Sequence, residues 1–246
     1  MTPMKQLFRA VKSVIDVAYF PRLFAQRAAY DKIEDWPTLV AEVCRPRGRH
    51  SIFANQYPSE IGAVCDLVRP MSPKVIVEIG TSRGGTLYLL SRLVQPGGMV
   101  ISIDKPGEPG SVRPVMRTVY RSFGKKNGVQ VVTLDRDSHA SSTHAEIERL
   151  LAGRQIDFLF IDGDHSYDGV KADFVSYRRW VAPHGVIAMH DVAHPDTHHS
   201  IEVPRFWREL TAESFQHEAI VAFPGHSPGI GIIHNAGMPA VQKRAA

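Results

Sequence analysis

The stretch Lys74–Thr86 reads KVIVEIGTSRGGT, and it predicts a buried strand, a glycine turn and the start of a helix. An apolar run ends at Glu78, and three glycines follow before leucines at helical spacing. Glycine has no Cβ and tolerates a positive φ, so a ligand can approach such a turn closely and meet the N–H groups of the helix start. A carboxylate repels phosphate but suits a sugar hydroxyl or an ammonium group. The turn therefore favours a nucleoside that carries positive charge over a di- or triphosphate.

Length and composition favour one α/β domain of about 200 residues with an extension, since the chain has 246 residues, 43% hydrophobic and 22% charged. The net charge is +4, and residues 1–30 contain five basic residues against one acidic residue. The rest of the chain is near neutral, which argues against nucleic acid as a partner. The cysteines, Cys44 and Cys65, fit no metal-binding spacing. They indicate buried thiols in a reducing compartment, and hence a cytoplasmic protein.

The N-terminal segment, residues 1–30, is basic and has an apolar stripe at helical spacing. No apolar run approaches the roughly 20 residues that span a membrane, and a signal peptide is disfavoured because no long apolar core is present. We expect an amphipathic helix packed on the domain or on a second subunit, with a weak membrane-surface contact as the alternative. The predicted division is a basic extension (1–54), a ligand-binding domain (55–235) and a C-terminal tail (236–246).

Strand-like and helix-like segments alternate from residue 74 onward, which predicts a mainly parallel sheet with helices on both faces. The strand-like segments are 75–79, 99–103, 129–134, 156–161 and 185–189, with two more near 219–223 and 229–233. The helix-like segments are 86–94, 112–123, 143–152, 169–181 and 202–212. Residues 31–73 are expected to be irregular apart from a short helix near 58–68. Ligands bind at the carboxyl ends of the strands in such sheets.

Polar side chains end the second and third predicted strands. Asp104 lies 24 residues after Gly80, a spacing that suits a carboxylate accepting from both ribose hydroxyls. We favour this role over that of a solvated strand end. Ser138 follows the third strand, where it could meet an adenine edge or cap the next helix, and both roles stay open.

Acidic and histidine residues end the fourth and fifth predicted strands. Asp162, Asp164 and His165 follow one, and His190 and Asp191 end the other. If the strands are neighbours, two aspartates would face each other, and such a pair repels unless a cation or proton lies between them. Oxygen ligands suit Mg²⁺, and a histidine nearby could act as a general base. The alternative is a capping or salt-bridge cluster at the sheet edge.

These motifs together resemble those of class I S-adenosylmethionine-dependent methyltransferases. The matching stretches are EIGTSRGGT (78–86), the strand-end Asp104, FIDGDHSYDGVKAD (160–173) and GVIAMHDV (185–192). The resemblance covers about residues 55–235. It is strongest to the branch that includes cephalosporin-hydroxylase-like proteins, and catechol O-methyltransferases and macrolide-sugar O-methyltransferases are more distantly similar.

The resemblance implies a doubly wound, seven-stranded sheet whose last strand is antiparallel, with an N-terminal helical extension. The cofactor contacts that it implies are Glu78, Gly80, Thr81, Ser82, Gly84, Asp104, Ser138 and Asp162. In metal-dependent relatives, acidic residues after strands four and five hold Mg²⁺, which implies Asp162 and Asp191 here. His190 is the candidate third ligand, with Asp164 or water as alternatives. His165 occupies the position of a catalytic base.

The predicted function is methyl transfer from S-adenosylmethionine to a hydroxyl of a sugar, glycan or phenolic compound, assisted by Mg²⁺ or another divalent cation. One alternative is a metal-dependent nucleotide-sugar glycosyltransferase, because 162–164 has the D-x-D form. A second is a non-enzymatic module recruited to membranes through residues 1–30. An NAD-dependent oxidoreductase is disfavoured because the turn lacks G-x-G-x-x-G spacing. A homo-oligomer is left open.

Overall fold

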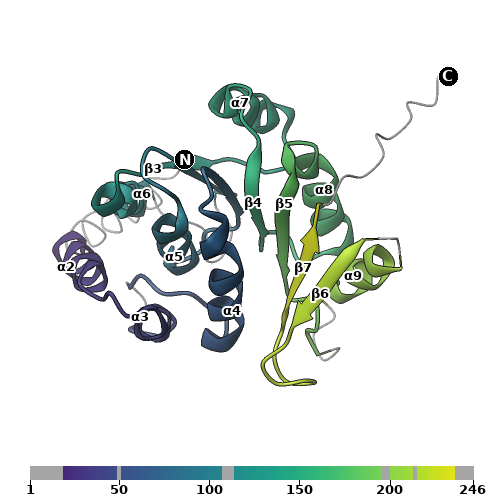
Figure 1. Cartoon of the computed structure of the whole chain (residues 1–246), viewed down its shortest axis with the longest axis horizontal. Coiled ribbons are helices and arrows are strands. Elements are labelled where there is room, and N and C mark those ends of the chain that lie inside the picture. The colour runs from purple at the N-terminus through teal and green to yellow at the C-terminus, as the bar shows by residue number, and fades with distance from the viewer. Residues whose placement is uncertain (1–18, 49–50, 107–113, 196–199, 213–214, 236–246) are drawn as a thin grey trace, which may run out of the picture.

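A seven-stranded sheet with helices on both faces forms the body of the protein (Figure 1). The computed structural model describes residues 19–48, 51–106, 114–195, 200–212 and 215–235. The strands are β1 (Val75–Ile79), β2 (Met99–Asp104), β3 (Gln130–Asp135), β4 (Ile156–Ile161), β5 (Val181–His190), β6 (Gln216–Ile220) and β7 (Ile230–His234).

The helices alternate with the first five strands and also precede the sheet. They are α2 (Phe20–Asp31), α3 (Trp36–Val43), α4 (Pro58–Val68), α5 (Gly85–Leu93), α6 (Pro114–Tyr120), α7 (Ser141–Leu151), α8 (Tyr167–Arg178) and α9 (Val203–Thr211). Short 3₁₀ helices cover Arg69–Met71 and Phe123–Asn127.

The strand order is β3-β2-β1-β4-β5-β7-β6, with β7 antiparallel to both of its neighbours. This confirms the predicted fold class. The strand order reverses between β1 and β4, and ligands bind outside the carboxyl ends of strands at such a point. The register pairs Ile79 with Ile161 and Ile161 with Met189. The residues that follow these three therefore meet at one edge of the sheet.

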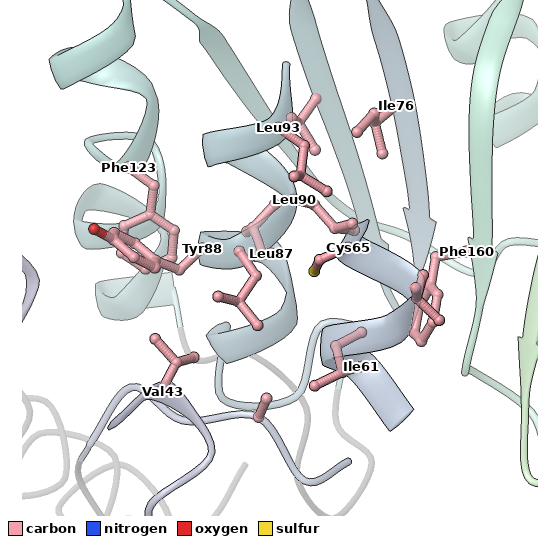
Figure 2. Close-up of a cluster of buried hydrophobic side chains, with 14 of the residues drawn as sticks. Val43, Ile61, Cys65, Ile76, Leu87, Tyr88, Leu90, Leu93, Phe123 and Phe160 are labelled. Carbon is pink, nitrogen blue, oxygen red and sulfur yellow. The ribbon is translucent and has the colours of Figure 1, made fainter. Parts of the chain in front are cut away.

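Two apolar cores lie on opposite faces of the sheet, because successive strand residues point to opposite sides. On one face, Ile76 lies in a core with residues of α2–α5. Figure 2 shows part of it, where the rings of Tyr88 and Phe123 meet edge to face at 5.2 Å between centroids. On the other face, Val75 and Val77 pack with residues of α7–α9. Helices therefore cover both faces of the sheet, so a ligand can approach it at the carboxyl edge.

The segment before β1 is more regular than we predicted. Helix α3 begins after Asp35, whose carboxylate accepts a hydrogen bond from the Thr38 N–H at 3.0 Å. Leu23 of α2 and Val43 of α3 are fully buried in the same core as β1 and α5. Residues 20–43 therefore pack as part of the domain's core. The predicted apolar helical stripe lies within residues 1–18, and both this segment and the predicted tail 236–246 are outside the described residues.

Strands β5 and β6 differ most from their predicted bounds, while the ends of β2, β3 and β7 differ by one residue. Strand β5 begins at Val181 rather than 185, because Val181 pairs with Ile156 before a register shift. Strand β6 ends at Ile220, because the pairing of Ile220 with Ile230 leaves residues 221–229 as a turn. Among the described helices, none is long and apolar enough to cross a membrane.

Candidate active site

A pocket of about 1050 Å³ opens at the carboxyl edge of the sheet, over the point where the strand order reverses. Most of the predicted site residues line it. These are Gly80, Ser82, Asp104, Ser138, Asp162, His165, His190 and Asp191. Glu78, Thr81 and Gly84 are buried and do not line the pocket. The sheet edge thus brings the predicted nucleoside end and the predicted acidic cluster into one cavity.

The glycine turn after β1 cannot carry side chains where its glycines stand. Gly80 has a φ of +91°, and a Cβ there would lie 1.9 Å from the carbonyl oxygen of Asp162. At Gly85 a Cβ would lie 2.0 Å from backbone atoms of Phe53 and Ala54. Ser82 lies between these two glycines and has a φ of +45°, which is uncommon for a residue other than glycine. The turn is therefore packed tightly from behind and leaves its other side to the pocket.

Glu78 lies beneath the turn and has no exposed surface. The Ser102 hydroxyl donates to its Oε2 at 2.6 Å, and the Thr81 hydroxyl forms a hydrogen bond with the Ser102 hydroxyl. Burial raises the pKa of Glu78 to about 8. Its Oε1 is buried with no hydrogen-bond partner among the described residues. Direct contact between Glu78 and a cofactor stays a prediction.

Asp104 joins the turn to the end of β2. Its Oδ1 accepts a hydrogen bond from the Thr81 N–H at 3.0 Å. This bond holds the carboxylate at the pocket, where Ser138 and Lys105 also contribute to the lining. The bond joins residues 23 apart in the chain, Thr81 and Asp104. Asp104 thus lies at the end of β2 as expected, and its contact with a ribose stays a prediction.

At the carboxyl ends of β4 and β5, two histidines each lie close to both Asp162 and Asp191. His190 Nδ1 lies 3.2 Å from Asp162 Oδ1 and 3.3 Å from Asp191 Oδ1. His165 Nε2 lies 3.4 Å from Asp162 Oδ1 and 3.5 Å from Asp191 Oδ2. Asp191 is buried and has a φ of +67°, a conformation that Asp tolerates better than most residues. The predicted meeting of Asp162 and Asp191 is therefore seen in the structure.

The electrostatics of this cluster follow from its two carboxylates. Burial alone would raise the pKa of Asp162, but the charge of His190 and the hydrogen bond from His165 outweigh burial and lower it. Burial opposes the charged form of His190, but Asp162 outweighs it and raises the His190 pKa. The hydrogen bond to Asp162 likewise raises the pKa of His165. The carboxylates therefore favour positive charge between them, in the form of imidazolium or of a metal ion.

The donor atoms of the cluster also fit a divalent cation. Asp162, His165 and Asp191 can each offer one ligand atom, and these atoms lie within 4.8 Å of one another. His190 Nδ1 is as close to both carboxylates as His165 Nε2. Carboxylate oxygens with an imidazole nitrogen suit Mn²⁺, Fe²⁺ or Zn²⁺, while Mg²⁺ prefers oxygen ligands.

Gln56 is a site residue that the sequence pattern did not reveal. Its Nε2 donates to Asp162 Oδ2 at 2.7 Å, across 106 residues of chain, and its Oε1 accepts from the Thr86 hydroxyl at 2.7 Å. The side chain is 5% exposed. It therefore connects the start of α5 to the acidic cluster and occupies one oxygen of Asp162. No motif marks it, because the contact exists only in the folded chain.

His139 is a second residue that the sequence analysis did not select. It lines the pocket beside Ser138, and its Nε2 lies 3.2 Å from Oδ1 of the fully buried Asp173. The nearby carboxylate of Asp173 raises the pKa of His139. A positive charge at the Ser138 end of the pocket is thereby favoured.

A model of the protein family described as "Methyltransferase domain" matches residues 77–192. The match runs from Val77 in β1 to the residue after Asp191, so it contains the four stretches that carry the resemblance. The prediction that the chain carries a methyltransferase domain is confirmed.

Solved structures share the fold at low identity. The O-methyltransferase TomG from Streptomyces achromogenes, in complex with S-adenosylmethionine, is 19% identical with a TM-score of 0.57, covering 84% of this chain and 92% of that one. An O-methyltransferase from Bacillus cereus, in complex with S-adenosylhomocysteine, is 19% identical with a TM-score of 0.55, covering 86% and 97%. These likenesses confirm the class I methyltransferase fold.

Curated relatives match over shorter stretches. An uncharacterised protein of Acanthamoeba polyphaga mimivirus is 32% identical over 115 residues, which is 47% of this chain and 50% of the relative. An uncharacterised protein of Sinorhizobium fredii is 27% identical over 149 residues, which is 59% of this chain and 16% of the relative. The chain thus spans half or less of the length of these relatives.

Proposed function

We propose that the chain is an S-adenosylmethionine-dependent O-methyltransferase that acts on a hydroxyl of a sugar or phenolic acceptor, either a small molecule or a glycan. The observation that carries the proposal is one pocket with two unlike groups of lining residues. The glycine turn and Asp104 line it after β1 and β2, and the cluster of Asp162, His165, His190 and Asp191 lines it after the adjacent strands β4 and β5. Methyl transfer needs mainly the alignment of a nucleoside cofactor with an acceptor, which such a pocket can provide.

The cofactor end suits a nucleoside without phosphate. Asp104 is proposed to accept from the ribose hydroxyls and Ser138 to meet the adenine, while Gly80 and Ser82 let the methionine portion lie against the backbone. The buried carboxyl of Glu78 beneath the turn adds negative charge when it ionises, and a positive sulfonium or ammonium group nearby favours that ionised form.

The acceptor end suits a hydroxyl that must lose a proton. Asp162, Asp191 and His190 are proposed to hold a divalent cation. When bound, that ion orients the acceptor hydroxyl and lowers its pKa. His165, with 39% of its side chain exposed, is proposed to receive the proton. The positive charge of a bound cation would lower the pKa of His165 and so favour the neutral imidazole that can accept the proton.

Methyl transfer from a labelled cofactor tests the proposal. The purified chain is screened against sugar and phenol acceptors, with Mg²⁺, with Mn²⁺ and with a chelator. We expect label transfer to at least one acceptor, and loss of transfer in Asp162→Ala. Asp168→Ala, which removes an exposed aspartate at the start of α8, is the matched control.

Calorimetry separates the proposal from its rival. S-adenosylhomocysteine should bind to Asp162→Ala nearly as well as to the unaltered chain, because the variant leaves the proposed ribose and adenine contacts, Asp104 and Ser138, unchanged. Binding of a UDP-sugar without binding of S-adenosylhomocysteine would instead support a glycosyltransferase. Full transfer by Asp162→Ala in the presence of chelator would refute the role of the metal. A cytoplasmic location, a membrane contact through residues 1–30 and a homo-oligomer stay predictions.

A further inference from the structure

Two aromatic side chains, Tyr57 and Phe223, stand exposed and side by side near the carboxyl edge of the sheet. Their ring centroids lie 5.7 Å apart in an edge-to-face arrangement, and Tyr57 is 37% and Phe223 56% exposed. In the part of the chain that the structure describes, the other strongly exposed large apolar side chain is Val175 of α8. Paired aromatic rings at a surface carry a cost in water and mark sites of recognition more often than single apolar residues do.

Hydrogen bonds fix the backbone of the two residues that carry these rings. The carbonyl of Tyr57 accepts hydrogen bonds from the N–H groups of Glu60 at 3.0 Å and Ile61 at 3.1 Å, in the first turn of α4. The N–H of Phe223 donates to the Ser227 hydroxyl at 3.0 Å, and the Phe223 carbonyl accepts from the Ser227 N–H at 2.9 Å. Rings on a fixed backbone lose little conformational freedom when a ligand binds.

A buried carboxylate connects the two elements that carry these rings. Glu60 of α4 has no exposed surface, and its Oε1 accepts a hydrogen bond from the N–H of Ala222, next to Phe223, at 2.9 Å. Burying a carboxylate is unfavourable unless it is hydrogen-bonded. The bond therefore fixes the turn between β6 and β7 against the start of α4.

Residues next to each ring in the chain contact the acidic cluster or the segment that follows it. Gln56, which precedes Tyr57, donates to Asp162. Pro228, in the same turn as Phe223, accepts a hydrogen bond at 2.7 Å from the N–H of Ala193, two residues after Asp191. The segments that carry the two rings are thus hydrogen-bonded to the acidic cluster or to the residues just after it. Asn55, two residues before Tyr57, lines the pocket itself.

We infer that Tyr57 and Phe223 form a subsite that receives a ring of the acceptor, beyond the hydroxyl that is methylated. The chemistry that fits is a flat apolar face flanked by hydroxyls, which an aromatic ring and the C–H face of a sugar ring both provide. The inference rests on the proposed function, because it takes the acidic cluster as the place of the reacting hydroxyl.

The test measures the affinity of two ring compounds, catechol and methyl α-D-mannopyranoside, for the full chain by saturation-transfer NMR, with and without S-adenosylhomocysteine. Tyr57→Ala and Phe223→Ala should each weaken binding of at least one probe roughly 2- to 10-fold. Phe223→Leu, which keeps apolar volume but removes the ring, should behave like Phe223→Ala. Val175→Ala is the control, and it should leave probe affinity unchanged. The probe that responds distinguishes an aromatic from a sugar acceptor.

Two results would overturn the inference. One is that neither probe binds to the unaltered chain. The other is that the double variant of Tyr57 and Phe223 binds both probes within twofold of the unaltered chain. Melting temperatures confirm that the variants fold. Absence of S-adenosylhomocysteine binding by the unaltered chain would count against the proposed function, whereas probe binding that does not depend on the two rings would count against the subsite alone.

Discussion

Replacing Glu78 with glutamine tests the electrostatics of the glycine turn. Burial raises the pKa of Glu78 from 4.5 to about 8, so the carboxyl is protonated in the folded protein at neutral pH. A carboxyl with a raised pKa in the folded state contributes stability fully below pH 4.5, and this contribution is lost as the pH rises towards 8. Between pH 5 and pH 7 the loss amounts to roughly 2–3 kcal/mol, since each pKa unit corresponds to about 1.36 kcal/mol.

The assay is urea unfolding followed by circular dichroism at pH 5, 6 and 7. Glutamine does not titrate, so the stability of Glu78→Gln relative to the unaltered chain should rise by roughly 2–3 kcal/mol across this range. Glu148→Gln, which removes an exposed glutamate of α7, controls for the loss of one negative charge. A difference in stability between Glu78→Gln and the unaltered chain that stays constant from pH 5 to pH 7 would show that the pKa of Glu78 is not raised in the folded protein, contrary to this prediction.

Three further substitutions test other contacts. Gly80→Ala should destabilise the fold by about 3 kcal/mol or more in thermal unfolding, because its Cβ would overlap the Asp162 carbonyl oxygen. The control is Gly97→Ala, which is also at positive φ but in open space and should destabilise the fold less. Equal losses of stability in the two variants would exclude the overlap as the cause. Asp104→Asn should weaken S-adenosylhomocysteine binding roughly 10- to 100-fold in calorimetry, because hydrogen bonds to a charged acceptor are stronger than neutral ones; unchanged affinity would remove the ribose role. Gln56→Leu should cost about 1–3 kcal/mol in urea unfolding, since it leaves polar groups of Asp162 and Thr86 unpaired; a variant as stable as the unaltered chain would contradict this.

Local patterns predicted the sheet well. The bounds of β1 and β4 agree with the sequence prediction to the residue, because buried parallel strands are short apolar runs with clear turn residues beside them. The sequence also carried a signal for α3 that we did not use, namely Asp35 as N-cap and Pro37 in the first turn. Strand β6 is mostly exposed and lacks an apolar run, so its bounds depend on pairing with β7 rather than on its own pattern.

The site was predictable where chemistry follows a strand and unpredictable where it depends on packing. Parallel strands bring their carboxyl ends together, so Asp162 and Asp191 could be expected to meet once β4 and β5 were taken as neighbours. Gln56 reaches Asp162 from a distant segment, and Asp173 contacts His139 from the middle of a helix. Such contacts are set by how the helices pack on the sheet, which no local pattern reports.

The most direct test of the account is a calorimetric titration of the purified full chain with S-adenosylhomocysteine. The account predicts saturable binding at one site per chain, competed by S-adenosylmethionine and weakened in Asp104→Asn. A flat titration with correctly folded protein would contradict the claim that the carboxyl edge of this sheet holds that nucleoside.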